Sequence, residues 1–365
     1  MKHQKSYDKI LLATVILLSI FGLIMISSAS VVVSYNNFGY NHYYLSHQFF
    51  YGFIPGMILL FLFQKIDYHI FKKYALLFLI LTIIFLFLVF IPAFGYDLKG
   101  ANRWINIGDF SFQPSEIAKL TFILYLAAWL EKKGKDVKNF SETLVPFVIL
   151  IIAISIPLIM QPDIGTLSVI ILTAVIIYFA AGAKLSHIFL LGLGGTAALL
   201  MLIKIAPYRI NRLMVFMYPE LDPQGIGYQI NQALLALGSG GILGLGFGHS
   251  RQKFNYLPEP IGDSIFAITG EEMGFVGLFV LMALFLIVAL RGFKIASRAP
   301  DDFGRFIAIG ITSWIIFQAL TNMAAITSLI PLTGIPMPFI SYGGSALIIS
   351  LMGVGILLNI SKYGK

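Results

Sequence analysis

Residues 74–91 read Tyr74-Ala-Leu-Leu-Phe-Leu-Ile-Leu-Thr-Ile-Ile-Phe-Leu-Phe-Leu-Val-Phe-Ile91, an apolar run without a charged side chain. A helix of about 20 such residues spans the hydrocarbon core of a bilayer. Similar segments recur along the chain, at residues 9–33, 47–64, 73–92, 114–130, 144–161, 165–182, 186–206, 264–290, 304–328 and 340–360. The sequence therefore predicts an all-α integral membrane protein with ten transmembrane helices.

The composition excludes a soluble protein. Of the 365 residues, 58% are hydrophobic and 12% are charged, whereas soluble domains carry about 25% charged residues. The sequence has no Cys, so disulfides and thiolate metal sites are excluded, and the six His have no metal-ligand spacing. The first apolar run is longer than the core of a signal peptide, about 7–15 residues, so we interpret it as an uncleaved first helix.

The net charge of +8 indicates topology rather than nucleic-acid binding, because the cations sit in short loops between apolar runs. With the N-terminus inside, most Lys and Arg fall on the cytoplasmic side, near both termini and around residues 65–73, 132–138 and 291–305. We therefore predict cytoplasmic termini, a single membrane domain over residues 1–365, and one long extracytoplasmic loop, residues 206–263, between helices 7 and 8. Residues 227–237 within this loop alternate like a short amphipathic helix.

Acidic side chains gather where this loop meets the eighth helix, in Tyr256-Leu-Pro-Glu-Pro-Ile-Gly-Asp-Ser-Ile-Phe-Ala-Ile-Thr-Gly-Glu-Glu-Met-Gly274. A carboxylate at a bilayer boundary costs several kcal/mol unless it is hydrated, paired or bound to a cation. Asp263 is either an N-cap or a site residue. A helix running on from Asp263 would place Glu271 on the same face about 12 Å deeper. Gly270 permits close helix packing, which makes a structural role for Glu271 an alternative.

Three more segments place polar groups on the same predicted side. Glu116 and Lys119 are spaced as a helical ion pair, but Arg103 and Lys119 could instead receive a phosphate. Asp163, in the 161–165 turn, is either an N-cap or part of the same cavity. Ser341 and Ser345 follow the outward turn of residues 330–339, where hydroxyl and N–H groups serve the turn or face an anion.

These segments together resemble the SEDS family of shape, elongation, division and sporulation proteins. The matching pieces occur in order: Gly100-Ala-Asn-Arg-Trp-Ile, Gln113-Pro-Ser-Glu-Ile-Ala-Lys-Leu, Gln161-Pro-Asp-Ile-Gly-Thr, Gly227-Tyr-Gln, Gly238-Ser-Gly-Gly, Leu257-Pro-Glu, Asp263 with Phe266-Ala, Gly270-Glu-Glu-Met-Gly-Phe and Pro338-Phe-Ile-Ser-Tyr-Gly-Gly-Ser. Arg251-Gln-Lys-Phe and Thr333-Gly-Ile-Pro-Met-Pro-Phe resemble the FtsW branch more than the RodA branch. Where the family usually reads Leu-Pro-Glu-x-His-Thr-Asp-Phe, this chain has Ile261, Gly262 and Ser264 around the retained Asp263.

The resemblance implies a bacterial cell-membrane enzyme with ten helices, acting outside the cytoplasm on lipid II. The implied activity is polymerisation of glycan strands in division or elongation, with release of undecaprenyl pyrophosphate. The implied partners are the nascent glycan strand, other division or elongation proteins, and a class B penicillin-binding protein for cross-linking. The family's required Asp maps to Asp263, and Glu259 belongs to the family pattern without a clear chemical role.

Such a reaction is an inverting displacement, which needs a base at the acceptor hydroxyl and charge stabilisation at the leaving group. We expect Asp263 to be the base. The pyrophosphate charge would be offset by Arg103, Lys119, Arg209 and Arg212, or by a divalent cation, Mg²⁺ or Mn²⁺, bound with the substrate. Glu116 and Asp163 would orient Lys119 or shape the cavity.

Two other classes of function fit a polytopic chain. A transporter or lipid flippase should carry its acids near the bilayer midplane on broken helices, whereas Asp163, Glu259 and Asp263 are predicted at the outward boundary. A noncatalytic division scaffold would have no need of Asp263.

Overall fold

The computed structural model describes residues 6–92, 94–98, 101–107, 110–205, 207–218, 222 and 225–364; at positions 96–98, 101, 107, 110 and 207–209 it describes the backbone alone. The long helices are α1 (Lys9–Ala29), α4 (Ile54–Lys65), α5 (His69–Leu88), α6 (Pro114–Lys133), α7 (Val145–Met160), α8 (Ile164–Ala180), α9 (Leu185–Ile205), α12 (Ile265–Arg298), α13 (Asp302–Ile326) and α14 (Gly344–Ser361). Short elements connect them: α2 (Val31–Phe38), α3 (Tyr43–Gln48), η1 (Phe49–Phe53), η2 (Gly134–Lys138) and η3 (Phe140–Leu144).

Helices cover all ten predicted segments, and eight of them are long and apolar enough to cross a membrane. Of the other two, α8 is shorter, and α6 carries the Glu116–Lys119 pair inside its first two turns. The chain is therefore a multi-pass membrane protein. The main shift in a boundary is at α12, which continues to Arg298 rather than ending near residue 290.

The predicted loops are not structureless. Residues 92–113 contain an antiparallel sheet of three strands in the order β1 (Gly95–Leu98), β2 (Ala101–Ile107) and β3 (Phe110–Phe112). The all-α prediction missed this sheet. The long loop contains α10 (Pro207–Met217) and α11 (Ile226–Gly240), and α11 confirms the short amphipathic helix predicted there.

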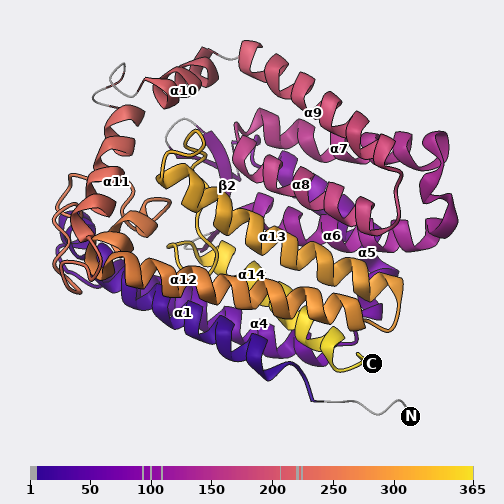
Figure 1. Ribbon diagram of the computed structural model, residues 1–365, viewed down its shortest axis with the longest axis horizontal. Coiled ribbons are helices and arrows are strands. Elements are labelled where there is room, and N and C mark those ends of the chain that lie inside the picture. Colours follow the sequence, from indigo (N-terminus) through magenta and orange to yellow (C-terminus); the bar gives the residue numbers. More distant parts are fainter. Residues whose placement is uncertain are drawn as a thin grey trace.

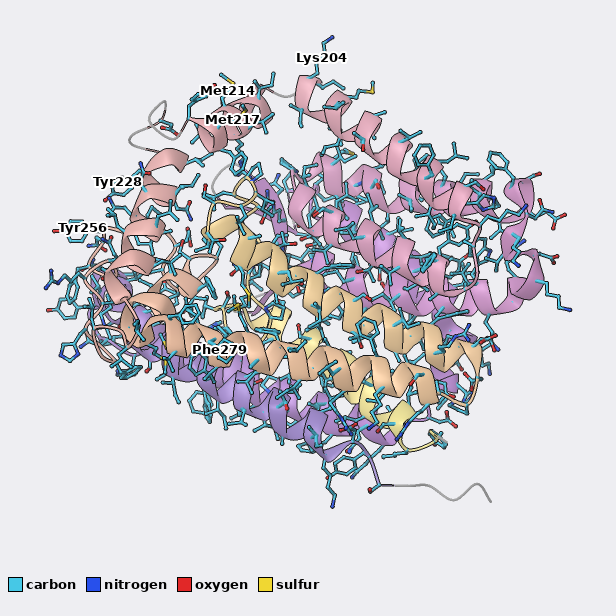
Figure 2. All side chains as sticks on the ribbon, in the orientation of Figure 1. Lys204, Met214, Met217, Tyr228, Tyr256 and Phe279 are labelled. Atoms are coloured by element: carbon cyan, nitrogen blue, oxygen red, sulfur yellow. The ribbon has the colours of Figure 1, made fainter. Side chains whose placement is uncertain are left out.

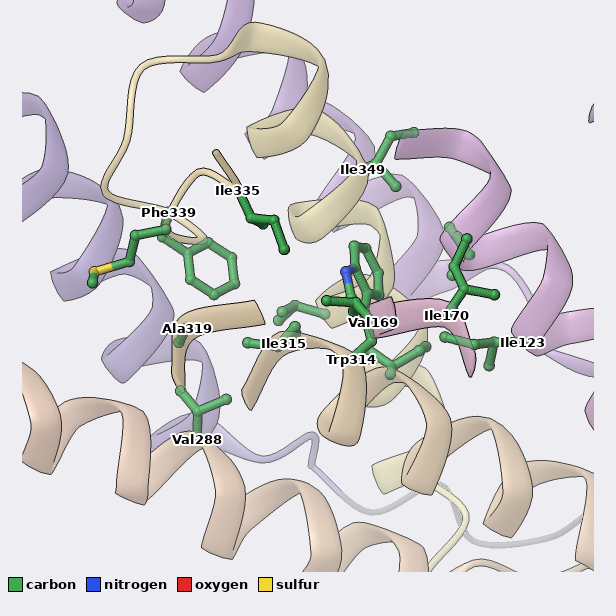
Figure 3. Packing of buried hydrophobic residues seen from close by; sticks show 14 of the residues in the cluster. Ile123, Val169, Ile170, Val288, Trp314, Ile315, Ala319, Ile335, Phe339 and Ile349 are labelled. Atoms are coloured by element: carbon green, nitrogen blue, oxygen red, sulfur yellow. The ribbon is translucent and has the colours of Figure 1, made fainter. Parts of the chain in front are cut away.

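Helices α13 and α14 form the centre of the bundle. Of the most apolar window of each, 72% is buried, whereas 0% of the corresponding window of α9 is buried, so α9 lies at the periphery. Trp314 of α13 is 1% exposed and lies beside Val169 and Ile170 of α8 and Ile123 of α6 (Figure 3). A tryptophan and branched aliphatic side chains thus fill the space where three helices meet.

The two ends of the bundle differ. In Figure 1, α11 covers one end of α12, and both chain termini lie at the other end. Side chains of α9, α10 and α11, among them Lys204, Met214, Met217 and Tyr228, follow one edge of the molecule (Figure 2). Any group that belongs to the turn before α12 is therefore presented at the end opposite the termini.

Helix α12 is interrupted at Gly274, whose φ of 64° and ψ of −166° are not helical. The carbonyls of Glu271 and Glu272 accept hydrogen bonds from the N–H groups of Leu245 and Gly246, at 2.9 and 3.0 Å. Two N–H groups beyond the break, those of residues 275 and 276, donate to the carbonyls of residues 241 and 242, at 2.9 and 3.1 Å. The glycine-rich segment 241–246 thus satisfies the backbone groups that the break exposes, as an apolar surrounding requires.

Replacement of Gly274 by Ala is expected to destabilise the protein. An added Cβ would lie 2.3 Å from the nitrogen of Gly244 and 2.5 Å from the oxygen of Ile242, and the backbone conformation is one that only Gly adopts readily, at a cost of about 1–3 kcal/mol for other residues. Thermal unfolding in detergent should show a drop in Tm of several degrees. Gly194→Ala is the matched control, because nothing lies within 4 Å of a Cβ there and Ala favours a helix; an equal drop in both variants would contradict the role of the break.

Candidate functional site

Asp263 lies in the turn that precedes α12, at the end of the bundle covered by α11. The carbonyl of Glu259 closes this turn by accepting from the N–H groups of Gly262 and Ser264, at 3.0 and 3.3 Å. The helix begins only at Ile265, with Ser264 at the N-cap position. The N-cap interpretation of Asp263 is therefore wrong, and the start of the helix lies one residue beyond the predicted 264. The Asp263 side chain is half-buried.

A buried amide on α13 fixes the backbone of this turn. The Nδ2 of Asn322 donates to the carbonyl of Asp263 and to the carbonyl of Ile335, both at 2.8 Å. Asn322 is itself almost completely buried. The amide therefore connects the Asp263 turn to the 330–339 turn. Removing it would leave both carbonyls without this hydrogen bond, which is costly in a buried position.

The hydroxyl of Ser341 makes a second connection. It donates to the carbonyl of Gly262 at 2.7 Å and accepts from the N–H of Met337 at 2.8 Å. The N–H of Tyr342 donates to the carbonyl of Ile261 at 2.8 Å. All of these contacts are made to the backbone, so the unusual side chains at positions 261 and 262 leave them intact. Ser341, a predicted anion-binding group, holds the turn here.

The Asp263 carboxylate lies between α11 and the 330–339 turn. Its Oδ1 accepts from the Nε2 of Gln229 at 3.4 Å, and the same nitrogen lies 3.1 Å from the Oγ of Ser264. On the other side is Gly334, with a φ of +70°, where an added Cβ would lie 3.9 Å from Oδ2 of Asp263. The carboxylate thus sits in a position set by elements from three parts of the chain.

Lys119 is buried rather than open to an anion. Its Nζ donates to Glu116 Oε1 at 2.8 Å and to Gln318 Oε1 at 2.7 Å, and both charged side chains are at most 3% exposed. The Nε2 of Gln318 in turn donates to the carbonyl of Pro336 at 2.9 Å. This geometry favours the ion-pair interpretation over phosphate binding. Through Gln318, the pair is also connected to Pro336 of the 330–339 turn, two residues after Gly334.

Arg103 and Asp163 meet at the 161–165 turn. Arg103, on β2, donates to the carbonyl of Gln161 at 2.9 Å and to that of Pro162 at 2.7 Å. Asp163 caps α8 by accepting from the N–H of Thr166 at 3.2 Å, which confirms the N-cap interpretation. Arg103 thus holds the turn against the small sheet.

The remaining predicted residues are spread around the 330–339 turn. Arg212 of α10 donates to the carbonyl of Leu332 at 3.2 Å, and Ser345 accepts weakly, at 3.4 Å, from the N–H of Gln113. The side chain of Arg209 lies outside the described residues. The structure thus brings Arg212, on α10, and Asp263, in the turn before α12, to the same 330–339 turn.

Glu271 and Glu272 are fully buried and anchor the segment that leads to the Asp263 turn. Glu271 accepts from the N–H groups of Arg251 and Gln252, at 3.0 and 3.3 Å. Glu272 accepts from Lys253 Nζ at 3.0 Å and from the hydroxyl of Ser28 at 2.6 Å. These contacts match the structural alternative for Glu271. At Gly270, α11 approaches so closely that an added Cβ would lie 2.5 Å from Leu237.

Several buried oxygens around these groups have no hydrogen-bond partner among the described residues, among them Glu116 Oε2, Gln161 Oε1, Asp163 Oδ2, Glu272 Oε2, Asn322 Oδ1 and Thr333 Oγ1. Unpartnered buried polar atoms are rare in native proteins and typically mark positions for ordered water or ligand. The described residues contain no group of three or more His, Asp or Glu arranged to hold a metal ion.

The sequence reasoning missed three amides, Gln229, Gln318 and Asn322. Gln229 belongs to a motif that was recognised, but its contact with Asp263 depends on how α11 packs. Gln318 and Asn322 are spaced i,i+4 in an apolar helix, so they share one face. Polar side chains within a membrane segment usually face the protein interior and mark a site, and that spacing was the available signal.

Comparison with known proteins identifies relatives over the whole chain. A family described as FTSW_RODA_SPOVE, cell cycle protein, matches residues 8–365. "Stage V sporulation protein E" of Bacillus subtilis is 42% identical over 99% of each chain. A Geobacter sulfurreducens protein named "Probable peptidoglycan glycosyltransferase FtsW" is 41% identical, over 100% of this chain and 97% of its own. These nearly equal identities do not separate division from sporulation.

Solved structures share the fold. A chain from a peptidoglycan synthase complex, described as coordinating polymerization and crosslinking, has a TM-score of 0.79 at 25% identity, over 97% of each chain. The rod shape determining protein RodA of Thermus thermophilus has a TM-score of 0.71 at 25% identity, over 97% of this chain and 96% of its own.

Lys119→Met should destabilise the protein, because it leaves the Glu116 carboxylate buried and without its cation, a change that costs about 3–5 kcal/mol. Thermal unfolding in detergent should show a clear loss in Tm, and the double variant Glu116→Gln/Lys119→Met should recover part of it. An unchanged Tm for Lys119→Met would show that Lys119 is not a structural partner of Glu116 and would return it to the substrate-binding candidates.

Proposed function

Because the chain belongs to the FtsW/RodA/SpoVE family of cell cycle proteins, we propose that it is a peptidoglycan glycosyltransferase that polymerises lipid II into glycan strands and releases undecaprenyl pyrophosphate. The observation that carries the proposal is the placement of Asp263. Its carboxylate stands half-buried at one end of the bundle, and its turn is held by Asn322 and Ser341.

In this reaction Asp263 is the general base. The donor is the growing strand, whose anomeric carbon is bonded to lipid pyrophosphate, and the acceptor is the 4-hydroxyl of lipid II. Asp263 removes the hydroxyl proton while the oxygen attacks the anomeric carbon and the carbon–pyrophosphate bond breaks. A base must lie within hydrogen-bond reach of the proton it takes. Asn322 and Ser341 bond to the carbonyls of Asp263 and Gly262, and these contacts hold the base in a fixed position.

The leaving pyrophosphate needs positive charge rather than a proton. The candidates are Arg103 and Arg212, whose guanidinium groups contact the turns at residues 161–165 and 330–339. A guanidinium has five N–H donors; Arg103 uses two on backbone carbonyls and Arg212 one. Both therefore keep donors for phosphate oxygens. Alternatively, a divalent cation, Mg²⁺ or Mn²⁺, bound with the substrate pyrophosphate would supply this positive charge, because such ions prefer oxygen ligands. Lys119 acts indirectly, by holding Gln318 against the 330–339 turn.

The topology that suits this reaction has ten crossings, cytoplasmic termini and Asp263 outside the cell membrane. Lys65, Lys72, Arg298 and Arg305 lie at or near helix ends on the side of the termini, which agrees with the excess of cations in cytoplasmic loops. The whole chain acts as one membrane domain in which residues 206–263 form the outward cover.

The chain acts with a transpeptidase. The structural relative belongs to a complex that combines polymerization with crosslinking, and we propose a class B penicillin-binding protein as the partner here, together with other division or elongation proteins.

A flippase, a scaffold and a polymerase make different predictions in one assay. Labelled lipid II is incubated with the purified chain and its transpeptidase partner, and the length of glycan products is measured. A flippase or a scaffold yields no polymer, whereas the proposed enzyme does.

Asp263→Asn should lower polymerisation in this assay by about 10²–10⁴-fold, the usual contribution of a general base. Expression and Tm should remain near those of the parent protein, because the backbone contacts of the turn persist. Asp302→Asn, the same change at an exposed carboxylate at the start of α13, is the control. Full activity in the Asp263 variant would refute the assignment.

Asn322→Leu should lower kcat with little change in KM, because the turn that carries the base loses its anchor. Asn359→Leu is a matched control for general destabilisation: Asn359 is equally buried, and its Nδ2 donates to the carbonyl of Gln64 at 2.8 Å, far from Asp263 in the fold. The two variants are compared at temperatures equally far below their Tm values. Equal losses of kcat would show that Asn322 supports only stability.

A further inference from the structure

A polar pocket of about 340 Å³ lies at the end of the bundle opposite Asp263. It is formed where the start of α1, the last turns of α12 and the end of α14 meet. Its lining is rich in cations and hydroxyl groups, and comprises Ser6, Tyr7, Asp8, Lys9, Ile10, Arg291, Lys294, Ile295, Arg298, Ser361 and Gly364.

One of the cations has a structural task. The guanidinium of Arg291 forms a bidentate pair with Asp8, with Nε–Oδ1 and Nη2–Oδ2 distances of 3.1 and 2.5 Å. Asp8 also caps α1 by accepting from the N–H of Leu11, and its own N–H donates to the hydroxyl of Ser361. Arg291 and Asp8 therefore join α12, α1 and α14, and together they add no net charge to the pocket.

Among the described residues, the other cations of the lining have no carboxylate partner. Within the described part of the chain, no carboxylate lies within 4.0 Å of the ammonium or guanidinium groups of Lys9, Lys294 or Arg298. Lys294 and Arg298 are i,i+4 neighbours on one face of α12, where like charges repel each other. Both side chains are exposed. The pocket thus concentrates positive charge that an anion would neutralise.

The backbone adds to this preference. The first N–H groups of α1, those of Lys9 and Ile10, have no partner within the helix, and the start of a helix attracts negative charge. The pocket therefore offers an anion charged side chains beside the start of a helix, and Ser6 and Tyr7 are among the residues that line it. A phosphate group matches these donors.

The position of the pocket favours a phosphate that belongs to a membrane lipid over a soluble one. The 34 residues of α12 span up to roughly 50 Å at 1.5 Å per residue, which is comparable to the roughly 40–45 Å thickness of a bilayer with its headgroups. If one end of α12 meets the outer interface, the pocket lies at the inner one. Basic pockets between membrane helices at that level bind the headgroups of anionic lipids.

We propose that this pocket binds the phosphate diester headgroup of an anionic membrane lipid in the leaflet on the side of the chain termini. Lys294 and Arg298 contact the phosphate, while the Arg291–Asp8 pair and the start of α1 form the rigid wall. The site is separate from the proposed reaction, and its lipid would join the first, the eighth and the last membrane helices of the predicted ten.

The test uses the full chain in detergent, titrated with phosphatidylglycerol or with phosphatidylcholine, and follows Tm and the number of bound lipids by native mass spectrometry. Lys294→Gln/Arg298→Gln is compared with Lys73→Gln/Lys132→Gln, which removes two exposed cations outside the pocket. Both double variants retain Arg291, so the contact with Asp8 persists, and an unchanged Tm without lipid confirms their folding.

Phosphatidylglycerol should stabilise the parent protein and the control variant, and its apparent affinity should fall about 25-fold in Lys294→Gln/Arg298→Gln, since each cation near an anionic headgroup contributes a factor of about five. Equal affinities in the two double variants would overturn the proposal. So would a parent protein that responds equally to phosphatidylcholine. Stabilisation by millimolar glycerol phosphate as strong as that by phosphatidylglycerol would assign the pocket to a soluble phosphate and overturn the lipid source.

Discussion

A membrane helix can break only where other protein groups satisfy its backbone, and this constraint governs the end of the bundle that carries Asp263. At Gly274 the helix α12 opens, and four of its backbone groups bond to the glycine-rich segment 241–246. An exposed N–H or C=O in hydrocarbon would cost several kcal/mol. The break and the segment therefore require each other. Glu271 and Glu272 lie just before the break. Their side chains bond to residues 251–253, in the segment that leads into the Asp263 turn.

The Asp263 turn depends on contacts that begin deep in the bundle. Glu116 and Lys119 form a buried ion pair within α6, and Lys119 also bonds to Gln318 of α13, which donates to the carbonyl of Pro336. Asn322 lies four residues further along α13. It connects the 330–339 turn to the Asp263 turn by bonding to the carbonyls of Ile335 and Asp263. A buried ion pair is weak evidence of stability. Here, however, the pair orients the side chain of Gln318, which in turn bonds to the backbone carbonyl of Pro336. The proposed base therefore stands on a rigid support instead of on a free loop.

Much of this could be predicted from the sequence, because apolar runs and loop charges are local signals. They located the helices, and the acidic stretch pointed to Asp263. The small sheet over residues 95–112 was missed because its strands are short and lie between membrane helices. The amides Gln229, Gln318 and Asn322 were missed because their roles depend on which helices pack together. Lys119 shows the limit of spacing: i,i+3 with Glu116 allowed both an ion pair and a phosphate ligand, and only burial distinguishes them.

The most direct measurement of the central claim is a structure of the Asp263→Asn variant with its transpeptidase partner and bound lipid II. The account predicts that the 4-hydroxyl of the acceptor sugar lies about 3 Å from the side chain of residue 263, within hydrogen-bond reach, with pyrophosphate oxygens near Arg103 or Arg212. An acceptor hydroxyl held by another carboxylate, with residue 263 outside hydrogen-bond distance, would contradict it.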